Sequence, residues 1–274
     1  MNHRRFAHLS DLHLGASAER TEVLVRKLLA EDIEHVIVTG DLTHQGAFAE
    51  FGLFLDVFEP LLRRGRLTFI PGNHDRTGED VGADWMNGQR VRTELHDGLY
   101  LVCVDSTGPH NRSYFAAHGD LCRTVLEQID NAVSAAPPNT VVTVLLHHHL
   151  VPLPEESVPE WLVTRLGFPN AGELELGADL LARLQQRCDL VLHGHRHKPR
   201  EFTFGANSSR KLSMYNAGSS TELGAYRVFE HHCGQVVGEP SWRVATTSKP
   251  PRTFSSNVLP ALRYAARQWG GVSF

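Results

Sequence analysis

Asp, Asn and His side chains recur in five short clusters along the first two-thirds of the chain. In order, the clusters are Asp11-Leu12-His13, Gly40-Asp41, Gly72-Asn73-His74-Asp75, His147-His148 and Gly194-His195-Arg196-His197. Histidine is the commonest metal ligand and a frequent acid–base group near neutral pH, while Asp and Asn supply oxygen ligands. This mixture of nitrogen and oxygen donors suits manganese, iron, zinc or cobalt, and it also suits proton transfer during hydrolysis.

Each cluster follows a short apolar run, and helix-like segments lie between the runs. The runs cover residues 5–10, 35–40, 67–70, 99–104, 140–146 and 189–194. Apolar residues recur at helical spacing in 19–31, 47–62, 119–136 and 178–187. Alternating strands and helices predict an α/β fold, and the nearly unbroken apolar runs predict strands that are buried on both faces. In such sheets, ligands bind beyond the carboxyl ends of the strands, so we expect the clusters to converge on one rim.

The composition limits the other functions that are open to the chain. A formal charge of −4 over 274 residues argues against a protein that coats nucleic acid through bulk charge. The sequence contains no stretch of 18 apolar residues and no apolar segment near its start, so we expect neither a membrane span nor a signal peptide, and a cytoplasmic protein. Reduced thiols in the core are expected at the four widely spaced cysteines, Cys103, Cys122, Cys188 and Cys233.

Two segments depart from the strand–helix alternation. Residues 151–177 are rich in Pro and acidic residues, and we expect either a flap over the rim or a surface insertion. We place the catalytic domain at 1–238 and a basic extension at 239–274, where a terminal helix is predicted from Asn257 to Gly270. We expect this tail to pack against the body or a second subunit, which would give a homodimer, in preference to contacting nucleic acid.

The order of the clusters resembles the pattern of the calcineurin-like metallophosphoesterase superfamily. That pattern is Asp-x-His, Gly-Asp, Gly-Asn-His-(Asp/Glu), a His after a strand, and Gly-His-x-His, and every position is filled between Asp11 and His197. The start "AHLSDLHLG" and the GNHD motif look most like the class III cyclic nucleotide phosphodiesterases and their glycerophosphodiesterase relatives. The resemblance implies a four-layer αββα sandwich with two central mixed sheets and an active site at the carboxyl ends of the strands.

The resemblance also implies a site for two divalent metal ions, drawn from Mn, Fe, Zn or Co. One ion would be held by Asp11, His13 and His197, and the other by Asn73, His147 and His195. Asp41 would bridge the two ions. His149 stands where the family usually has proline, so His148 is an alternative to His147. We expect His193 to be packed in the fold and not to bind metal.

In the family, the histidine at the position of His74 faces the substrate, where it protonates the leaving oxygen or stabilises charge on the phosphate. Asp75 would orient the His74 ring and raise its pKa. Loops near the expected rim carry further residues that would contact the substrate or, alternatively, be solvated. These residues are His44, Arg76, His110, Asn111, Arg112 and Trp161.

The function that this resemblance favours is hydrolysis of small phosphodiesters, with 3′,5′-cyclic nucleotides among the candidate substrates, by in-line attack of a metal-bridging hydroxide. A nuclease or a phosphomonoesterase of the same superfamily is the alternative. A scaffold that has lost catalysis is a more remote alternative, because every ligand position is retained.

Overall fold

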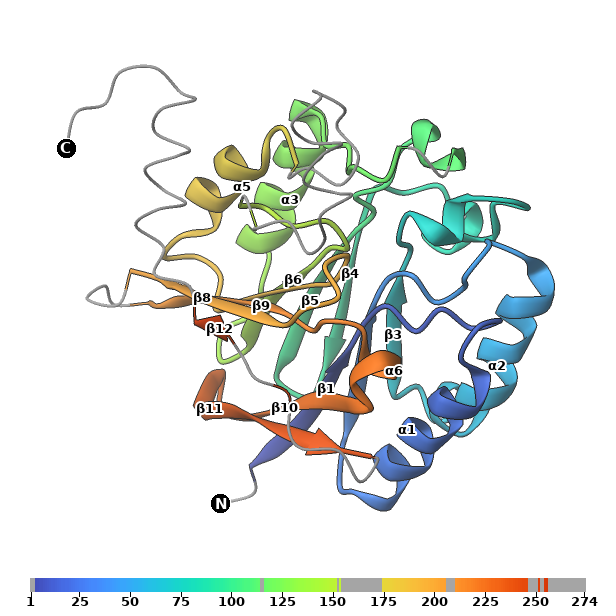
Figure 1. Ribbon diagram of the computed structural model, residues 1–274. Coiled ribbons are helices and arrows are strands. Elements are labelled where there is room, and N and C mark those ends of the chain that lie inside the picture. The colour runs from blue at the N-terminus through green and yellow to red at the C-terminus, as the bar shows by residue number, and fades with distance from the viewer. Residues whose placement is uncertain are drawn as a thin grey trace.

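The chain forms two β-sheets that pack face to face, with helices on both outer faces (Figure 1). This computed structural model describes residues 3–113, 116–151, 174–205 and 210–245, together with 153, 251 and 254–255. Helices α1 and α2 cover one sheet, and α3 and α5 cover the other. The predicted α/β sandwich of four layers is therefore confirmed.

The first sheet has five strands in the order β11-β10-β1-β2-β3. Their bounds are β1 Arg4–Leu9, β2 His35–Thr39, β3 Leu67–Ile70, β10 Ala225–His232 and β11 Gln235–Val244. Strands β1, β2 and β3 are parallel, and β10 and β11 extend the sheet as an antiparallel hairpin. Every residue of β2 is buried, as its β-branched sequence HVIVT predicts for a strand covered on both faces.

The second sheet has seven strands in the order β12-β8-β9-β7-β6-β5-β4. Their bounds are β4 Val91–His96, β5 Leu99–Val104, β6 Val141–Leu145, β7 Leu190–His193, β8 Arg200–Phe204, β9 Leu212–Asn216 and β12 Phe254–Ser255. Strands β5, β6, β7 and β9 are parallel, whereas β4 and β8 run antiparallel to their neighbours. Both sheets are therefore mixed, as predicted.

Amphipathic helices close the two outer layers. The helices are α1 Ala18–Ala30, α2 Phe48–Leu62, α3 Arg123–Ser134, α5 Gly177–Leu184 and α6 Ser220–Leu223, with short 3₁₀ turns η1 His74–Arg76, η2 Val81–Asp84 and η3 Pro109–Arg112. In α3 the buried residues Val125, Ile129 and Val133 recur every four positions, which places them on one face of the helix. That face packs on the seven-stranded sheet.

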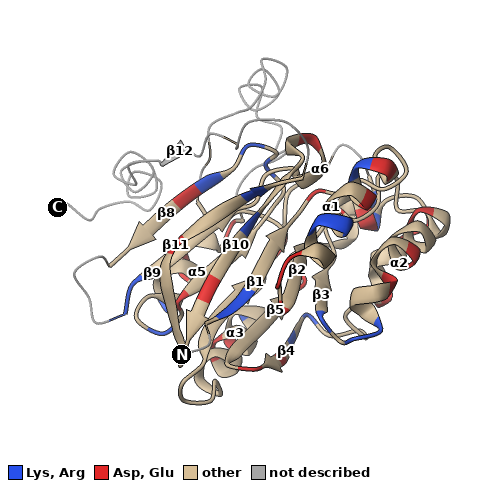
Figure 2. Cartoon of the chain, turned by 90° about the horizontal axis from the view of Figure 1, so that it is seen from below, with Lys and Arg blue, Asp and Glu red and all other residues tan. Residues whose placement is uncertain are grey.

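Three apolar clusters form the core. One lies under α1 and α2, one lies under α3 and α5, and the third fills the layer between the two sheets. Acidic and basic residues are interspersed over the described helices and strands (Figure 2). None of the helices in the described part of the chain has the length and apolar character that a membrane span requires.

Strand β11 continues to Val244, so the five-stranded sheet extends beyond the domain boundary that we placed at residue 238. The loss of acidic residues that suggested this boundary does not coincide with the end of a strand. Most of the 151–177 segment and the predicted helix at 257–270 lie outside the described residues. The four cysteines are unpaired as expected, but only Cys103 and Cys188 are buried.

Candidate metal centre

The five polar clusters meet at one edge of the molecule because each follows a parallel strand. Asp11 and His13 follow β1, and Asp41 and Asn73 follow β2 and β3 of the same sheet. His147 follows β6 of the other sheet, and His195 and His197 follow β7. The site therefore lies where the carboxyl ends of the two sheets adjoin, as the sequence predicts.

Tight turns place several of these side chains in an unusual backbone conformation. Asp11, His13, Asp41 and His195 have φ angles of 53°, 48°, 51° and 69°. Residues other than glycine rarely adopt this left-handed region, at a cost of about 1–3 kcal/mol each. Backbone hydrogen bonds from Asp11 N to Gly40 O (3.1 Å) and from His13 N to Asp41 O (3.0 Å) hold the first two turns together. The strain is thus concentrated where the polar side chains converge.

Asp11, His13 and His197 form the first group of potential ligands. Their ligand atoms all lie within 4.8 Å of one another. His13 Nε2 lies 3.2 Å from His197 Nε2, and His197 Nε2 lies 3.8 Å from Asp11 Oδ1. The structure thus brings together the three residues that the family resemblance assigns to one ion.

Asn73, His147 and His195 form the second group. Asn73 Oδ1 lies 3.1 Å from His147 Nε2 and 3.0 Å from His195 Nδ1. The other ring nitrogen of His147, Nδ1, donates a hydrogen bond to Thr39 O at 2.8 Å. This bond fixes the tautomer, because a neutral ring that donates from Nδ1 presents the lone pair of Nε2 toward Asn73.

Asp41 lies between the two groups. Its Oδ2 is 3.4 Å from His147 Nε2, and its Oδ1 accepts a hydrogen bond from His74 N at 2.8 Å. Asp41 also shares a cluster with Asp11 and His147, in which all ligand atoms lie within 4.8 Å of one another. A carboxylate in this position can contact ions held by either group.

The donor set fits divalent metal ions. Within the described residues, the buried Asp11 Oδ1 has no hydrogen-bond partner, and leaving such an atom unpaired costs about 1–3 kcal/mol. Metal–ligand bonds of about 2.0–2.2 Å place neighbouring ligand atoms roughly 3.0–3.5 Å apart. The separations of 3.0 and 3.1 Å around Asn73 Oδ1 and of 3.2 Å between His13 and His197 match this spacing.

Burial and the two carboxylates determine the charge of the site. Burial raises the pKa of Asp11 to about 6 and lowers that of His13 to about 3. Burial likewise holds the pKa of His195 well below its usual value. Burial opposes the protonation of His147, but Asp41 and Asp11 outweigh it and raise the His147 pKa to about 9. The carboxylates thus attract a proton to His147, and a metal ion must displace that proton to bind there.

The hydrogen bonds of the two rings favour His147 over His148 as the ligand, because Nε2 of His147 faces Asn73. His148 lies close enough to His147 and His195 to form a cluster with them. Its Nδ1, however, is 2.9 Å from Ser106 Oγ, and its Nε2 donates to Ala117 O at 3.0 Å. Both of its ring nitrogens are therefore occupied. His193 is fully buried, as expected for a packed residue.

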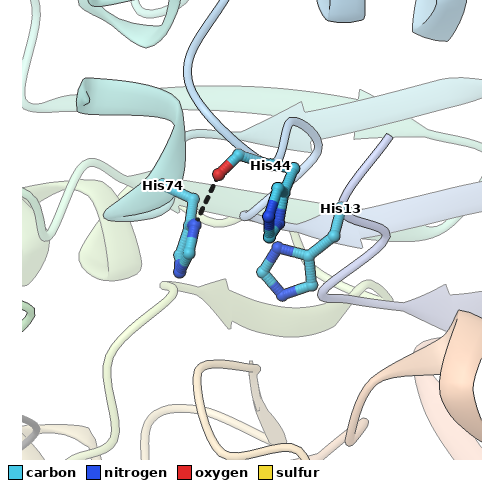
Figure 3. Close-up of side chains that lie close together, drawn as sticks. All are labelled: His13, His44 and His74. Atoms are coloured by element: carbon cyan, nitrogen blue, oxygen red, sulfur yellow. Dashed lines mark hydrogen bonds between the residues drawn. The ribbon is translucent and has the colours of Figure 1, made fainter. Parts of the chain in front are cut away.

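His74 and His44 lie beside the first ligand group (Figure 3). The His74 and His13 rings meet edge to face, with their centroids 4.7 Å apart. The centroid of the His44 ring lies 5.8 Å from each of the other two centroids. His74 Nδ1 donates a hydrogen bond to the backbone oxygen of His44 at 2.8 Å. The carbonyl of His44 therefore orients the His74 ring.

This geometry corrects the role expected for Asp75. The Asp75 carboxylate is fully buried and accepts hydrogen bonds from Gly72 N (2.9 Å), Thr43 N (2.8 Å) and Thr43 Oγ1 (2.7 Å). Neighbouring residues of a 3₁₀ turn point about 120° apart, so His74 and Asp75 face different surroundings. Asp75 connects the loop after β2 to the loop after β3, and the hydrogen bond that orients His74 comes from His44.

A family comparison agrees with this arrangement. Residues 4–199 match the family model described as calcineurin-like phosphoesterase. The chain belongs to the calcineurin-like phosphoesterase family. It is accordingly a metal-dependent phosphoester hydrolase, and the scaffold alternative is set aside.

Individual relatives of this phosphoesterase are distant. It is 28% identical over 214 residues to a "probable cyclic nucleotide phosphodiesterase" of Rhodopseudomonas palustris, covering 71% of this chain and 72% of the relative. It is 23% identical over 230 residues to another "probable cyclic nucleotide phosphodiesterase", from Pseudoalteromonas sp.. That match covers 79% of this chain and 78% of the relative. Purple acid phosphatase PPD1 from yellow lupin (Lupinus luteus) seeds has the same fold, with a TM-score of 0.62 at 12% identity. That comparison covers 93% of this chain and 54% of the lupin chain.

Four residues that we expected to contact the substrate of the phosphoesterase have partners within its own loops. Arg76 and Arg112 both pair with Asp80, and Arg112 Nη2 lies 2.8 Å from Asp80 Oδ2. Asn111 is buried and accepts a hydrogen bond from Gly108 N at 2.7 Å. His110 donates to His118 O at 2.7 Å. These contacts stabilise the loops, and Trp161 lies outside the described residues.

Two polar residues at the site were not identified from the sequence. Glu222 Oε1 lies 3.2 Å from His197 Nδ1, so this carboxylate orients the ring. Ser219 Oγ donates to Asp11 O at 2.9 Å and braces the first strained turn. A histidine ligand usually bonds a second partner through its other nitrogen, which predicts that such a group exists. The sequence does not indicate which of the acidic residues it is.

Proposed function

We propose that this phosphoesterase is a binuclear-metal phosphodiesterase that hydrolyses small phosphodiesters, with 3′,5′-cyclic nucleotides among its substrates. The observation that carries the proposal is the pair of ligand groups joined by Asp41. Asp11, His13 and His197 would hold one ion. Asn73, His147 and His195 would hold the other, as the family resemblance implies.

Two bound divalent ions supply electrostatic stabilisation of the phosphoryl oxygens and a water molecule that is acidic enough to attack phosphorus near neutral pH. Asn73 suits a site with two carboxylates, because its amide oxygen provides a ligand without adding negative charge. Backbone hydrogen bonds between the turns hold Asp11 and His13 beside Asp41.

His74 is the residue that we assign to the leaving group. Its Nδ1 proton is donated to the carbonyl of His44, so its Nε2 can donate a proton only when the ring is an imidazolium. In that form Nε2 can protonate the oxygen that leaves phosphorus, or donate a hydrogen bond to a phosphoryl oxygen. A positioned acid of this kind contributes about 10²–10⁴-fold to a rate.

His44 is the residue that we assign to binding the substrate phosphate. Its ring lies beside His13 and His74 at the first ligand group (Figure 3). Its Nδ1 is buried and has no hydrogen-bond partner within the described residues. An imidazole beside the first ligand group can donate a hydrogen bond to a phosphoryl oxygen. Of the predicted substrate contacts that the structure describes, His44 alone lies in this cluster of rings.

The choice of a diester as substrate is supported by the relatives named as probable cyclic nucleotide phosphodiesterases. The decisive experiment strips the protein with a chelator, reloads it with Mn²⁺ and compares hydrolysis of bis(p-nitrophenyl) phosphate with that of p-nitrophenyl phosphate. His74→Ala is measured in parallel. His232→Ala, at the far end of β10, is the matched control for removing a histidine.

We expect diester hydrolysis that requires Mn²⁺, falls steeply in His74→Ala and is unchanged in His232→Ala. A panel of 3′,5′-cyclic nucleotides would then define the physiological substrate. Hydrolysis of the monoester alone would reassign the protein as a phosphomonoesterase, and cleavage of DNA alone would reassign it as a nuclease. Protein that binds two Mn²⁺ ions but cleaves neither ester would refute a generalist phosphodiesterase.

A further inference from the structure

A cavity lined by arginines lies at the amino ends of β1 and β2, whereas the candidate metal centre lies beyond their carboxyl ends. Arg5 belongs to β1, and Arg64 and Arg66 belong to the turn that joins α2 to β3. All three arginines line the cavity, which has a volume of about 290 Å³. Pockets that hold small-molecule ligands begin at about 300 Å³, so a small ligand would fit here.

Two acidic residues also line the cavity, and both are paired with an arginine outside its lining. Arg4 Nη1 lies 2.9 Å from Glu34 Oε2 and 2.7 Å from Asp97 Oδ2. Arg5 Nη2 lies 3.3 Å from the exposed carboxylate of Asp32. Together with Arg4, the three arginines of the lining therefore face three carboxylates, and the excess positive charge belongs to the turn between α2 and β3.

Arg64 and Arg66 on this turn have guanidinium nitrogens that remain available. Arg66 Nε donates a hydrogen bond to the backbone oxygen of Glu34 at 2.9 Å, which leaves both terminal nitrogens of that guanidinium group available. Among the residues that the structure describes, no carboxylate pairs with Arg64 or with Arg66. Two positive charges on one short turn are therefore left without a counter-ion from the protein, and they attract an anion.

A buried histidine faces the same cavity. His231 of β10 lines the cavity, is only 4% exposed and has no hydrogen-bond partner for either ring nitrogen within the described residues. His35 and His96 also line the cavity, but each already contacts a polar side chain through Nε2. Burial lowers the pKa of His231 to about 4, and the nearby Arg4 lowers it further. The neutral ring keeps one N–H group, and buried groups of this kind nearly always have an acceptor.

We propose that this cavity binds the phosphoryl group of a small anionic ligand, with Arg64, Arg66 and His231 as its donors. The planar guanidinium group presents its N–H groups in a geometry that matches phosphate oxygens, and it stays charged at any physiological pH. A metal cation does not fit, because the carboxylates of the lining are already paired with Arg4. The ligand would join the turn between α2 and β3 to β10, and its binding would be separate from the hydrolysis of substrate.

The test measures the binding of inorganic phosphate by calorimetric titration, at an ionic strength held constant with chloride. Full-length protein is stripped of metals with a chelator and desalted, so that no metal ion can hold phosphate at the catalytic centre. Wild-type protein should bind one phosphate ion per chain. Arg64→Gln and Arg66→Gln should each weaken this binding by about 10–100-fold, because each variant loses a charge-assisted hydrogen bond. Arg63→Gln is the matched control, because Arg63 follows α2 directly, is 77% exposed, pairs with Glu59 and lies outside the lining. It should bind phosphate as tightly as wild type.

A second readout locates the bound phosphate. In NMR spectra of the histidine rings, phosphate should shift the His231 signals, which are assigned by their absence from His231→Gln. The shift should occur in wild type and Arg63→Gln but not in Arg64→Gln, while the Mn²⁺-loaded Arg64→Gln hydrolyses diesters at the wild-type rate.

The proposal would be overturned by a wild-type protein that binds no phosphate, or by equal binding in wild type and Arg64→Gln. If Arg66→Gln does not fold by circular dichroism, Arg64→Gln decides alone, because its exposed side chain has no partner to lose within the described residues. Neither result depends on which ester the metal centre cleaves.

Discussion

Replacing Gly72 with alanine should disrupt the candidate metal centre through a steric clash alone. A methyl group built on Gly72 would lie 2.3 Å from Asp41 Oδ1 and 2.4 Å from Asp41 N. Ordinary van der Waals contact for such a carbon begins at 3.4 Å. The backbone of Gly72 is not in the left-handed region, so alanine itself introduces no conformational strain.

The magnitude follows from the overlap of about 1 Å with a backbone nitrogen, which cannot rotate away as a flexible side chain can. The Asp41 turn or the Asn73 turn must move by a similar distance. Overpacking of this kind costs about 1–3 kcal/mol of stability. A displacement of about 1 Å at a reacting centre can lower turnover about 100-fold. We therefore expect Gly72→Ala to lose bound Mn²⁺ and about two orders of magnitude in turnover of bis(p-nitrophenyl) phosphate.

Gly52→Ala is the matched control for this variant. Gly52 lies inside α2, and a methyl group there would have no neighbour within 4 Å. Alanine at a helical position gains up to about 1 kcal/mol over glycine, so this variant should be as active as wild type and slightly more stable. The reasoning is refuted if Gly72→Ala binds Mn²⁺ fully, turns over at the wild-type rate and unfolds at the wild-type temperature.

Three further predictions concern other parts of the molecule. His74→Ala should lower the rate of diester turnover by about 10²–10⁴-fold. The variant should still bind Mn²⁺, because His74 lies outside both ligand groups. Loss of an ion, measured by metal analysis, would contradict this prediction. The unfolding free energy of the metal-free protein should fall as the pH drops from about 6.5 toward 3. Burial lowers the pKa of His35 to about 3, so the unfolded chain takes up that proton before the folded protein does. In urea titrations, the unfolding free energy of His35→Gln should depend less on pH than that of wild type. Glu201→Gln should lower the unfolding free energy by about 1–3 kcal/mol, because Arg227 is buried and its Nη1 lies 3.2 Å from Glu201 Oε2. An unchanged midpoint of urea unfolding would show that the Trp242 ring, which lies against the guanidinium, is enough to stabilise the charge of Arg227.

The parts of the fold that the sequence predicts are those whose pattern is local. Strand β2 is a β-branched apolar run, and α3 carries its buried residues at helical spacing, so neighbouring residues determine both elements. Strand β11 is different. Its sequence QVVGEPSWRV contains Gly238 and Pro240 and forms a strand through pairing with β10. Such pairing depends on partners outside the strand, which explains why the predicted domain boundary fell inside it.

The candidate site shows the same division. The order of the clusters along the chain predicted which residues converge, because each one follows a strand whose carboxyl end lies at a common edge. The directions and partners of the side chains were less predictable. Asp75 turns into the loop after β2, and Glu222 reaches His197 from α6. These contacts depend on how distant loops pack, which neither spacing nor residue type encodes.

The strained turns explain how the ligand positions are maintained. The left-handed conformations of Asp11, His13 and Asp41 destabilise the folded chain by about 1–3 kcal/mol each. This cost is offset by hydrogen bonds between the loops after β1 and β2, including the bridge between Leu14 and Thr43. One hydrogen-bonded unit therefore positions ligands of the first group together with the carboxylate that joins both groups. Because the main chain holds these residues in place, binding of an ion would require little movement of the backbone at Asp11, His13 and Asp41.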